Sequence, residues 1–540
     1  MPPGAVLVGA LTMTVSVWAV LQQCEPRLGH DESVYAGKAR EWATGTPATG
    51  WEAYRPVALP ALGSLALRVS NSTSAVRLVG LALALFTLGA VYAVASRTVG
   101  RRHAAVSILV ILGGATFLRR LPEFLDDIPA AGLLLVGAYL VARSRRPGGR
   151  WALVRAALVA DVMLPLRYGS LAGLLSVLGA AVLIWGPRTW ARDWRRVVEA
   201  AAVFCAGLVP LAVYGRQATG SWFGIFRQAE AIAHRAYVGE GLVYYATAYP
   251  FTLAGLLGAV VMAAGLARTL QDSATVLHLP GGGRRRSSRD RASPRGGDPG
   301  SGPVALVLPD TSTGQARAGG LVPPSDDEQV RLRAFLGCAA VIELLLLGLD
   351  AHGEGRFVLF TIFTLCVLGV RALTDVLPTS RRPAALLALT VLAVVAVPVD
   401  TAVIWVQIHQ VTGQLDAADS VGSVIAADAR RPATRSSRPG AGSFRLDSTT
   451  RRGSDRSCLV ITALPEEVAW VSGCRAVAPD RAWPLPRAVT AYAILFPGRS
   501  GWPTWTLIGR LDPLRTWSVQ DLGRRGDLGH AELAVSAPPG

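Results

Sequence analysis

The sequence is dominated by apolar runs of about 18 or more nearly uncharged residues, separated by short polar loops. A run of this length can cross the hydrocarbon core of a bilayer as a helix, where every backbone polar group must be hydrogen-bonded internally. Only 17% of the 540 residues are charged, against roughly 25% in soluble globular proteins. The sequence therefore predicts an all-α polytopic membrane protein and excludes soluble enzymes, disulfide-rich miniproteins and disordered tails.

We expect about eleven transmembrane helices. The first apolar run has no basic leader and no small-residue cleavage site, so we interpret it as a retained span and not as a signal peptide. Within residues 57–96 we expect a re-entrant or amphipathic stretch followed by one span. The predicted spans are residues 4–21, 57–96, 103–118, 128–143, 151–166, 169–186, 197–214, 246–268, 333–350, 356–374 and 383–401.

Arginine-rich loops follow alternate spans. They fall at residues 97–102, 143–150, 188–196, 269–332 and 371–382. The positive-inside rule places such loops in the cytoplasm, which puts the N-terminus inside and the C-terminus outside. This distribution accounts for the net charge of +17 without a nucleic-acid partner. We predict a multi-pass protein of the plasma membrane.

Two segments interrupt or follow the spans. Residues 269–332 are rich in Gly, Pro, Ser and Arg and predict a disordered cytoplasmic linker within a transmembrane domain over residues 1–401. Residues 402–540 are more polar and predict a small extracytoplasmic α/β domain, with a strand, a short helix and a second strand between about 457 and 477. Cys458 and Cys474 bracket this unit; on the oxidising side of the membrane they could form a disulfide or remain two free thiols.

The predicted outer loops carry clusters of ionisable residues at one membrane face. Each cluster alone has an ordinary interpretation as a helix cap, a solvated loop or a local ion pair. Four clusters on the same face indicate a functional site, because ionisable groups that converge at one boundary of a membrane domain are functional candidates. The clusters comprise His30, Asp31, Glu32, Tyr35 and Arg55 in the first loop, Asp126 and Asp127 in the second, Arg167 after the fifth span, and His352, Glu354 and Arg356 near residue 355.

These residues resemble the motifs of the GT-C membrane glycosyltransferases. An acidic pair after the first span, here Asp31-Glu32, is their shared signature. Tyr54-Arg55-Pro56 is similar to an element of the protein mannosyltransferase and aminoarabinose transferase branch, and Asp127-Ile128-Pro129 resembles the Asp-x-Pro that opens the fourth span. His352-x-Glu354-x-Arg356-Phe357 is similar to an element of GPI-type mannosyltransferases. The resemblance in topology extends over residues 1–400, whereas the matching motifs comprise only about twenty residues. These motifs combine features of several branches.

The resemblance implies transfer of a sugar from a polyprenyl phosphate to an acceptor outside the cytoplasm. Such a reaction needs a base for the acceptor hydroxyl and cations for the donor phosphate. Asp31 is the expected base and Glu32 the second acidic group, and we expect the pairing to raise the pKa of one of them. Arg356 is the first candidate for the phosphate, with His352, Arg167 and Arg55 as further candidates.

Other roles remain open at this stage. Asp127 is expected to bind hydroxyls or to share a divalent cation with Asp31, although no metal or other cofactor is required by the pattern. Tyr35 and Glu354 complete the expected substrate-binding set, and the sequence does not decide between Asp126 and Asp127. A single displacement would invert the anomeric configuration.

Mannose is the favoured sugar and arabinose its main rival. The acceptor could be a cell-envelope glycan, a lipoglycan or a secreted protein, in contact with membrane lipids. A transporter or lipid flippase is the main alternative class, but transporters place ionisable groups near the bilayer midplane, whereas these clusters lie at one face. A non-catalytic assembly subunit is a third class.

Overall fold

The computed structural model describes most of the chain. Statements below concern the described residues, which are all except 1, 26, 47, 147–148, 233–236, 249–250, 279–325, 351–352, 431–457, 482–484, 486–488, 512–514, 526–527 and 537–540.

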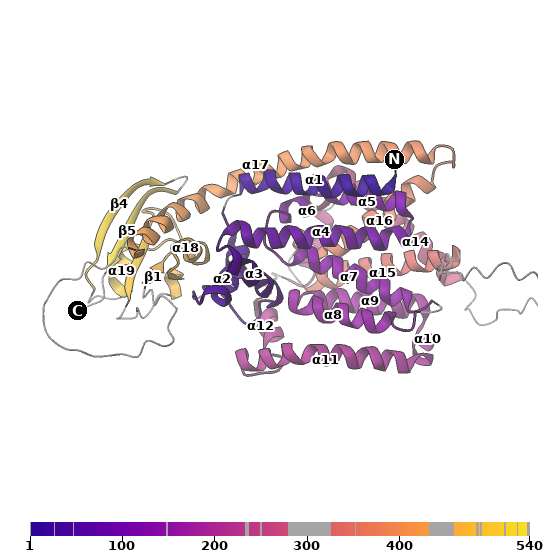
Figure 1. The fold of residues 1–540 in the computed structure, drawn as a ribbon, viewed down its shortest axis with the longest axis horizontal. Helices are drawn as coiled ribbons and strands as arrows, with labels where there is room; N and C mark the ends of the chain where they lie inside the picture. The colour runs from indigo at the N-terminus through magenta and orange to yellow at the C-terminus, as the bar shows by residue number, and fades with distance from the viewer. Residues whose placement is uncertain are drawn as a thin grey trace, which may run out of the picture.

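Long, nearly parallel helices form the body of the molecule, and a small sheet lies beyond one end of them (Figure 1). The helices are α1 (Pro3–Cys24), α2 (His30–Thr44), α3 (Ala58–Val69), α4 (Thr73–Thr98), α5 (Arg101–Leu112), α6 (Ala115–Arg120), α7 (Asp127–Arg143), α8 (Ala152–Leu166), α9 (Ser170–Trp185), α10 (Pro187–Arg192), α11 (Trp194–Thr219), α12 (Gly224–Ile232), α13 (Glu240–Ala248), α14 (Phe251–His278), α15 (Asp326–Asp350), the 3₁₀ helix η2 (Gly355–Val358), α16 (Leu359–Asp375) and α17 (Arg382–Arg430).

The predicted polytopic helical fold is confirmed. Within the described part of the chain, six helical segments are long and apolar enough to cross a membrane: Pro3–Gln23, Thr73–Thr98, Trp194–Thr219, Asp326–Leu349, Gly355–Asp375 and Arg382–Ile408. Most of the other predicted spans coincide with shorter helices, among them α5, α7, α8 and α9. The count of about eleven crossings stays a prediction.

The centre of the body is α16, which packs tightly on α14. Phe360 and Phe363 on α16 are almost fully buried. Glycines bring the two backbones together, since a Cβ at Gly369 of α16 would collide with the carbonyl oxygen of Val261 on α14. In contrast, α11 lies at the edge beside α8 (Figure 1) and exposes large apolar side chains such as Val198 and Val209. Such exposure is stable only against lipid or a partner, which agrees with a membrane-embedded body.

Two predicted boundaries differ from the structure. Residues 269–278 continue α14, and residues 326–332 begin α15, so both ends of the predicted linker are helical. The end at α15 is stabilised by acidic residues in its first turn and by an ion pair between Arg333 and Asp272 (2.9 Å). The middle of the linker lies outside the described residues. The predicted domain boundary at 401/402 falls inside α17, which runs on to Arg430.

The C-terminal unit is a five-stranded mixed sheet in the order β2-β1-β3-β5-β4. The expected strand, helix and second strand are β1 (Cys458–Ile461), α18 (Pro465–Ser472) and β2 (Arg475–Val477). β1 lies parallel to β2 and β3, while β5 is antiparallel to β3 and β4. A disulfide joins Cys458 to Cys474. The remaining elements are the 3₁₀ helix η3 (Pro479–Arg481), β3 (Thr490–Leu495), α19 (Trp505–Leu511), β4 (Ser518–Arg525) and β5 (Gly529–Ser536).

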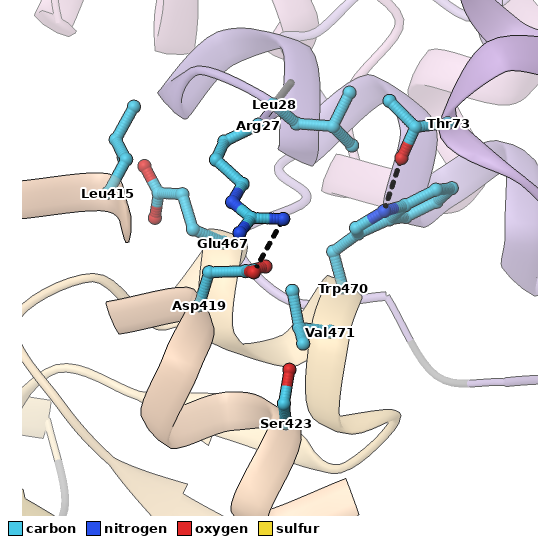
Figure 2. A pocket seen from close by; sticks show the side chains of 9 residues that line it. All are labelled: Arg27, Leu28, Thr73, Leu415, Asp419, Ser423, Glu467, Trp470 and Val471. Carbon is cyan, nitrogen blue, oxygen red and sulfur yellow. Dashed lines mark hydrogen bonds and ion pairs between the residues drawn. The ribbon is translucent and has the colours of Figure 1, made fainter. Parts of the chain in front are cut away.

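The C-terminal unit is docked on the first loop of the helical body. The last part of α17 contributes Val421 and Ile425 to the core beside the sheet. A cavity of about 280 Å³ lies in this interface. Figure 2 shows its lining, in which Arg27 pairs with Asp419 and the Trp470 indole donates to Thr73 Oγ1 (3.1 Å). The guanidinium of Arg40 also lies 3.3 Å above the Trp470 ring. These contacts place α18 next to α2, which carries the candidate site.

Candidate functional site

The position of α2 is determined by a buried ion pair. Arg77 of α4 donates to both carboxylate oxygens of Glu32 at 2.7 and 2.8 Å, and both side chains are only 1% exposed. Glu32 also accepts the backbone N–H of Phe124 (2.9 Å) and that of Gly29 (3.3 Å), which closes the start of α2. Glu32, expected to be the second acidic group of the reaction, therefore has its oxygens occupied by groups that join α2, α4 and the second loop.

Asp31, the neighbouring residue, points into open space and is held between two arginines. Its Oδ1 accepts from Arg55 (3.1 Å) and its Oδ2 from Arg356 (2.8 Å). The side chain is 31% exposed. Burial would raise the pKa of Asp31, but Arg356 and Arg55 outweigh burial and lower the pKa to about 2. The expectation that the acidic pair raises a pKa is therefore wrong for Asp31, because its nearest charged partners are cations.

Arg356 lies on η2, just before α16, and connects several elements of the site. Besides Asp31 it forms an ion pair with Glu354, and its guanidinium lies 5.6 Å from the centre of the Phe357 ring. Tyr245 of α13 donates to the backbone oxygen of Glu354 (3.3 Å). His352, predicted as a phosphate ligand, lies outside the described residues.

The second acidic cluster lies at the start of α7 and is paired with Arg167. Arg167 contacts Asp126 (3.1 Å) and Asp127, both nearly fully buried. Tyr35 of α2 donates to Asp126 Oδ2 (3.4 Å). Burial raises the pKa of Asp126 to about 6, helped by Asp127 and opposed by Arg167. Oδ2 of Asp127 has no hydrogen-bond partner among the described residues, so Asp127 retains one acceptor for a ligand.

Two cavities meet at Asp31. The larger, which we call the apolar-walled cavity, measures about 970 Å³. Its polar end holds Asp31, Tyr35, Arg55, Asp126, Asp127, Arg167 and Arg356, and its wall is formed by side chains such as Ala130, Leu134, Leu171, Leu175 and Leu347. The second, the polar cavity, measures about 730 Å³ and is lined by charged and polar groups that include Glu25, Arg119, Arg120, Glu123, Asp400 and Gln407. His30, Asp31, Leu125 and Arg356 line both cavities.

The structure does not favour the expected divalent cation between Asp31 and Asp127. Both oxygens of Asp31 lie on arginines, which leaves it poorly placed to share an ion with Asp127. Among the described residues, one group of three has donor atoms within 4.8 Å of one another: His30, Glu466 and Glu467. The His30 imidazole lies 3.4 Å from Glu466, and this contact with Glu466 raises the pKa of His30 against the effect of burial.

Sequence reasoning missed several residues of this region. Arg77 is a lone arginine in an apolar span, and such a residue signals a buried partner. Glu466 and Glu467 reach the site from the C-terminal unit, and no local pattern connects them with His30, which lies more than 400 residues earlier in the chain.

Comparison with known proteins identifies the fold. No protein-family model matches the chain, and no curated protein matches it significantly. The structure of ArnT from Cupriavidus metallidurans bound to undecaprenyl phosphate aligns with a TM-score of 0.59 at 14% identity, over 99% of this chain and 98% of that one. The apo structure of the same protein aligns equally well. The chain therefore shares the overall fold of ArnT.

A third structure aligns less closely. The Archaeoglobus fulgidus oligosaccharyltransferase complex with Zn and sulfate has a TM-score of 0.48 at 13% identity, over 87% of this chain and 62% of that one. The ArnT alignments span nearly the whole chain, so the shared fold includes both the helical body and the C-terminal unit.

Proposed function

We propose that the protein is a membrane glycosyltransferase that moves a sugar from a polyprenyl phosphate to an acceptor outside the cytoplasm, with Asp31 as general base. One observation carries this proposal: Asp31 lies between two arginines at the point where an apolar-walled cavity and a polar cavity meet. A lipid-linked donor needs an apolar channel ending in cations, and the acceptor hydroxyl must approach from the other side of the base. The ArnT neighbour is bound to undecaprenyl phosphate, which agrees with this type of donor.

The apolar-walled cavity suits the donor. Leu134, Leu171 and Leu175 provide a surface for the isoprenoid chain, while Arg55, Arg167 and Arg356 face the polar end where the phosphate would lie. Guanidinium groups match phosphate oxygens in geometry and charge. The phosphate is already a stable anion when it leaves, so these cations take the place of a strong general acid.

Donor binding would also activate the base. Arg356 and Arg55 keep the pKa of Asp31 near 2, and a carboxylate held this way is a weak base. A donor phosphate that attracts Arg356 would weaken the hydrogen bond from Arg356 to Asp31, and the pKa of Asp31 would then rise. We therefore propose that Asp31 becomes an effective base only when the donor is bound, which limits proton removal in its absence.

The polar cavity suits a hydroxyl-rich acceptor. Its charged and amide side chains, such as Glu123, Arg120 and Gln407, offer both donors and acceptors of hydrogen bonds, as a cell-envelope glycan or lipoglycan requires. Mannose remains our favoured sugar because of the Glu354-x-Arg356-Phe357 element, with arabinose as its rival. A cation held by His30 and the two glutamates would lie beside this cavity, but the proposed reaction does not require one.

A transfer assay tests the proposal. Membranes containing the protein are given labelled polyprenyl-phosphate-mannose or polyprenyl-phosphate-arabinose, and the label is followed into acceptor material. We expect transfer from one donor, and a raised KM for that donor in Arg356→Gln. Glu41→Gln, which alters a partly exposed pair with Lys38 on α2, is the control. No transfer from either donor, together with donor movement across sealed vesicles, would support a transporter instead.

A further inference from the structure

A third large cavity lies at the end of the helical body opposite the candidate site. It measures about 630 Å³ and is bounded by the C-terminal ends of α7, α9 and α14, the N-terminal end of α15, and α10. In Figure 1 these elements converge at the right, while α2 and the sheet lie at the left. The cavity is therefore separate from the proposed sugar-transfer site, and the inference drawn from it does not depend on that proposal.

The lining of this cavity is strongly cationic. Six arginines and one acidic residue line it: Arg143, Arg145, Arg146, Arg188, Arg192, Arg331 and Glu328. Arg145 pairs with Asp193 (2.6 Å), and Arg146 lies 3.8 Å from Glu328. For Arg188, Arg192 and Arg331 the described residues provide no acidic partner within 4.0 Å. Several cations around one cavity repel one another, and a bound anion would offset this repulsion.

The remaining walls are apolar and aromatic. Ile184, Val276 and Leu332 contribute aliphatic surface. Trp185 lines the cavity and packs on Phe335 with ring centres 4.8 Å apart. Trp and Tyr side chains are typical of the headgroup level of a bilayer. A free inorganic anion would use the arginines alone, whereas an amphiphile would use both kinds of wall.

We propose that this cavity binds the phosphate headgroup of an anionic phospholipid, with its glycerol and upper acyl chains against the aliphatic wall. Basic pockets between transmembrane helices at the cytoplasmic face suit such headgroups, and the arginine distribution predicts that this end is cytoplasmic. A general positive-inside bias accounts for the sign of the charge but not for the cavity. Arg97, Arg101 and Arg102 show the difference, because they belong to another arginine-rich loop of the same predicted face and are not among the residues that line this cavity.

Lipid binding to the full-length protein tests the proposal. Detergent-purified, delipidated protein is titrated with phosphatidylglycerol or phosphatidylcholine, and bound lipid is counted by native mass spectrometry, with inorganic phosphate as competitor. Arg188→Gln/Arg192→Gln/Arg331→Gln removes three lining charges. Arg97→Gln/Arg101→Gln/Arg102→Gln removes the same charge from the same end outside the cavity and is the matched control.

We expect the wild type and the control to prefer phosphatidylglycerol. We expect the lining variant to bind it about 100-fold more weakly, since it lacks three basic residues and each one near an anionic surface strengthens binding by about fivefold. If both triple variants lose affinity for phosphatidylglycerol equally, the binding depends on general surface charge and the proposal is overturned. Competition by inorganic phosphate at concentrations similar to the lipid would indicate a free-anion site and also overturn it. If the lining triple variant unfolds, Arg188→Gln/Arg192→Gln, which changes two exposed residues, replaces it.

Discussion

Glu32→Gln is the substitution for which the structure gives the clearest magnitude. It removes the only carboxylate that Arg77 contacts within hydrogen-bond distance among the described residues, and it leaves the guanidinium buried at 1% exposure. The remaining partners of Arg77 are neutral oxygens: the side-chain amide of Gln22 and the backbone carbonyls of Glu25 and Arg27. Removing one partner of a buried ion pair costs about 3–5 kcal/mol. We expect the free energy of unfolding of the helical body to fall by that amount.

Thermal unfolding in detergent, followed by fluorescence-detected size-exclusion chromatography, measures this loss. Glu41→Gln is the control on the same helix; its pair with Lys38 is partly exposed, so we expect a change below about 1 kcal/mol. The double variant Glu32→Gln/Arg77→Gln should regain part of the stability, because no unpaired charge stays buried. A Glu32→Gln protein as stable as the wild type but inactive in sugar transfer would refute the reasoning and make Glu32 part of the chemistry.

Three further predictions concern stability. The pKa of Asp31 falls from 3.8 to about 2 on folding, so its ionised form stabilises the protein by about 2 kcal/mol above about pH 4, and this contribution is lost as the pH falls toward 2. In Asp31→Asn the free energy of unfolding should therefore fall less steeply between about pH 4 and about pH 2 than in the wild type. An equally steep fall in the variant would contradict the two ion pairs of Asp31. Cys474→Ser removes the disulfide between two cysteines that are 16 residues apart. The free energy of unfolding of the C-terminal unit, measured in urea, should fall by about 2–4 kcal/mol, and a reducing agent should not lower it further in the variant. Gly369→Ala should lower the free energy of unfolding by about 1–3 kcal/mol, because the added Cβ meets the Val261 carbonyl where α16 packs on α14. A variant that melts at the wild-type temperature would contradict the close contact of the two helices.

The sequence predicted the convergence of distant polar residues well. Asp31, Arg55, Asp127, Arg167 and Arg356 line one cavity, as expected from their common position at one end of the spans. This works because an apolar span fixes which end of a helix a flanking residue occupies, and the alternation of arginine-rich loops relates one span to the next.

The pairing of these residues could not be predicted in the same way. Span topology places a residue at an end of the bundle but does not say whether its side chain faces a cavity or another helix. Asp31 and Glu32 are neighbours on α2, yet Asp31 faces the cavities and Glu32 pairs with Arg77 inside the body. The direction of the pKa shift of Asp31 depended on this difference. The approach of Glu466 to His30 depends on the docking of the C-terminal unit, which no local pattern specifies.

Donor binding and turnover measured on the same Asp31→Asn preparation test the central claim most directly. We predict that the variant binds the labelled polyprenyl-phosphate sugar at least as tightly as the wild type, because Arg356 is released from the carboxylate, while turnover falls about 10²-fold or more with the loss of the base. Near-normal turnover by a folded Asp31→Asn protein would contradict the assignment of Asp31 as the base and, with it, the proposed mechanism.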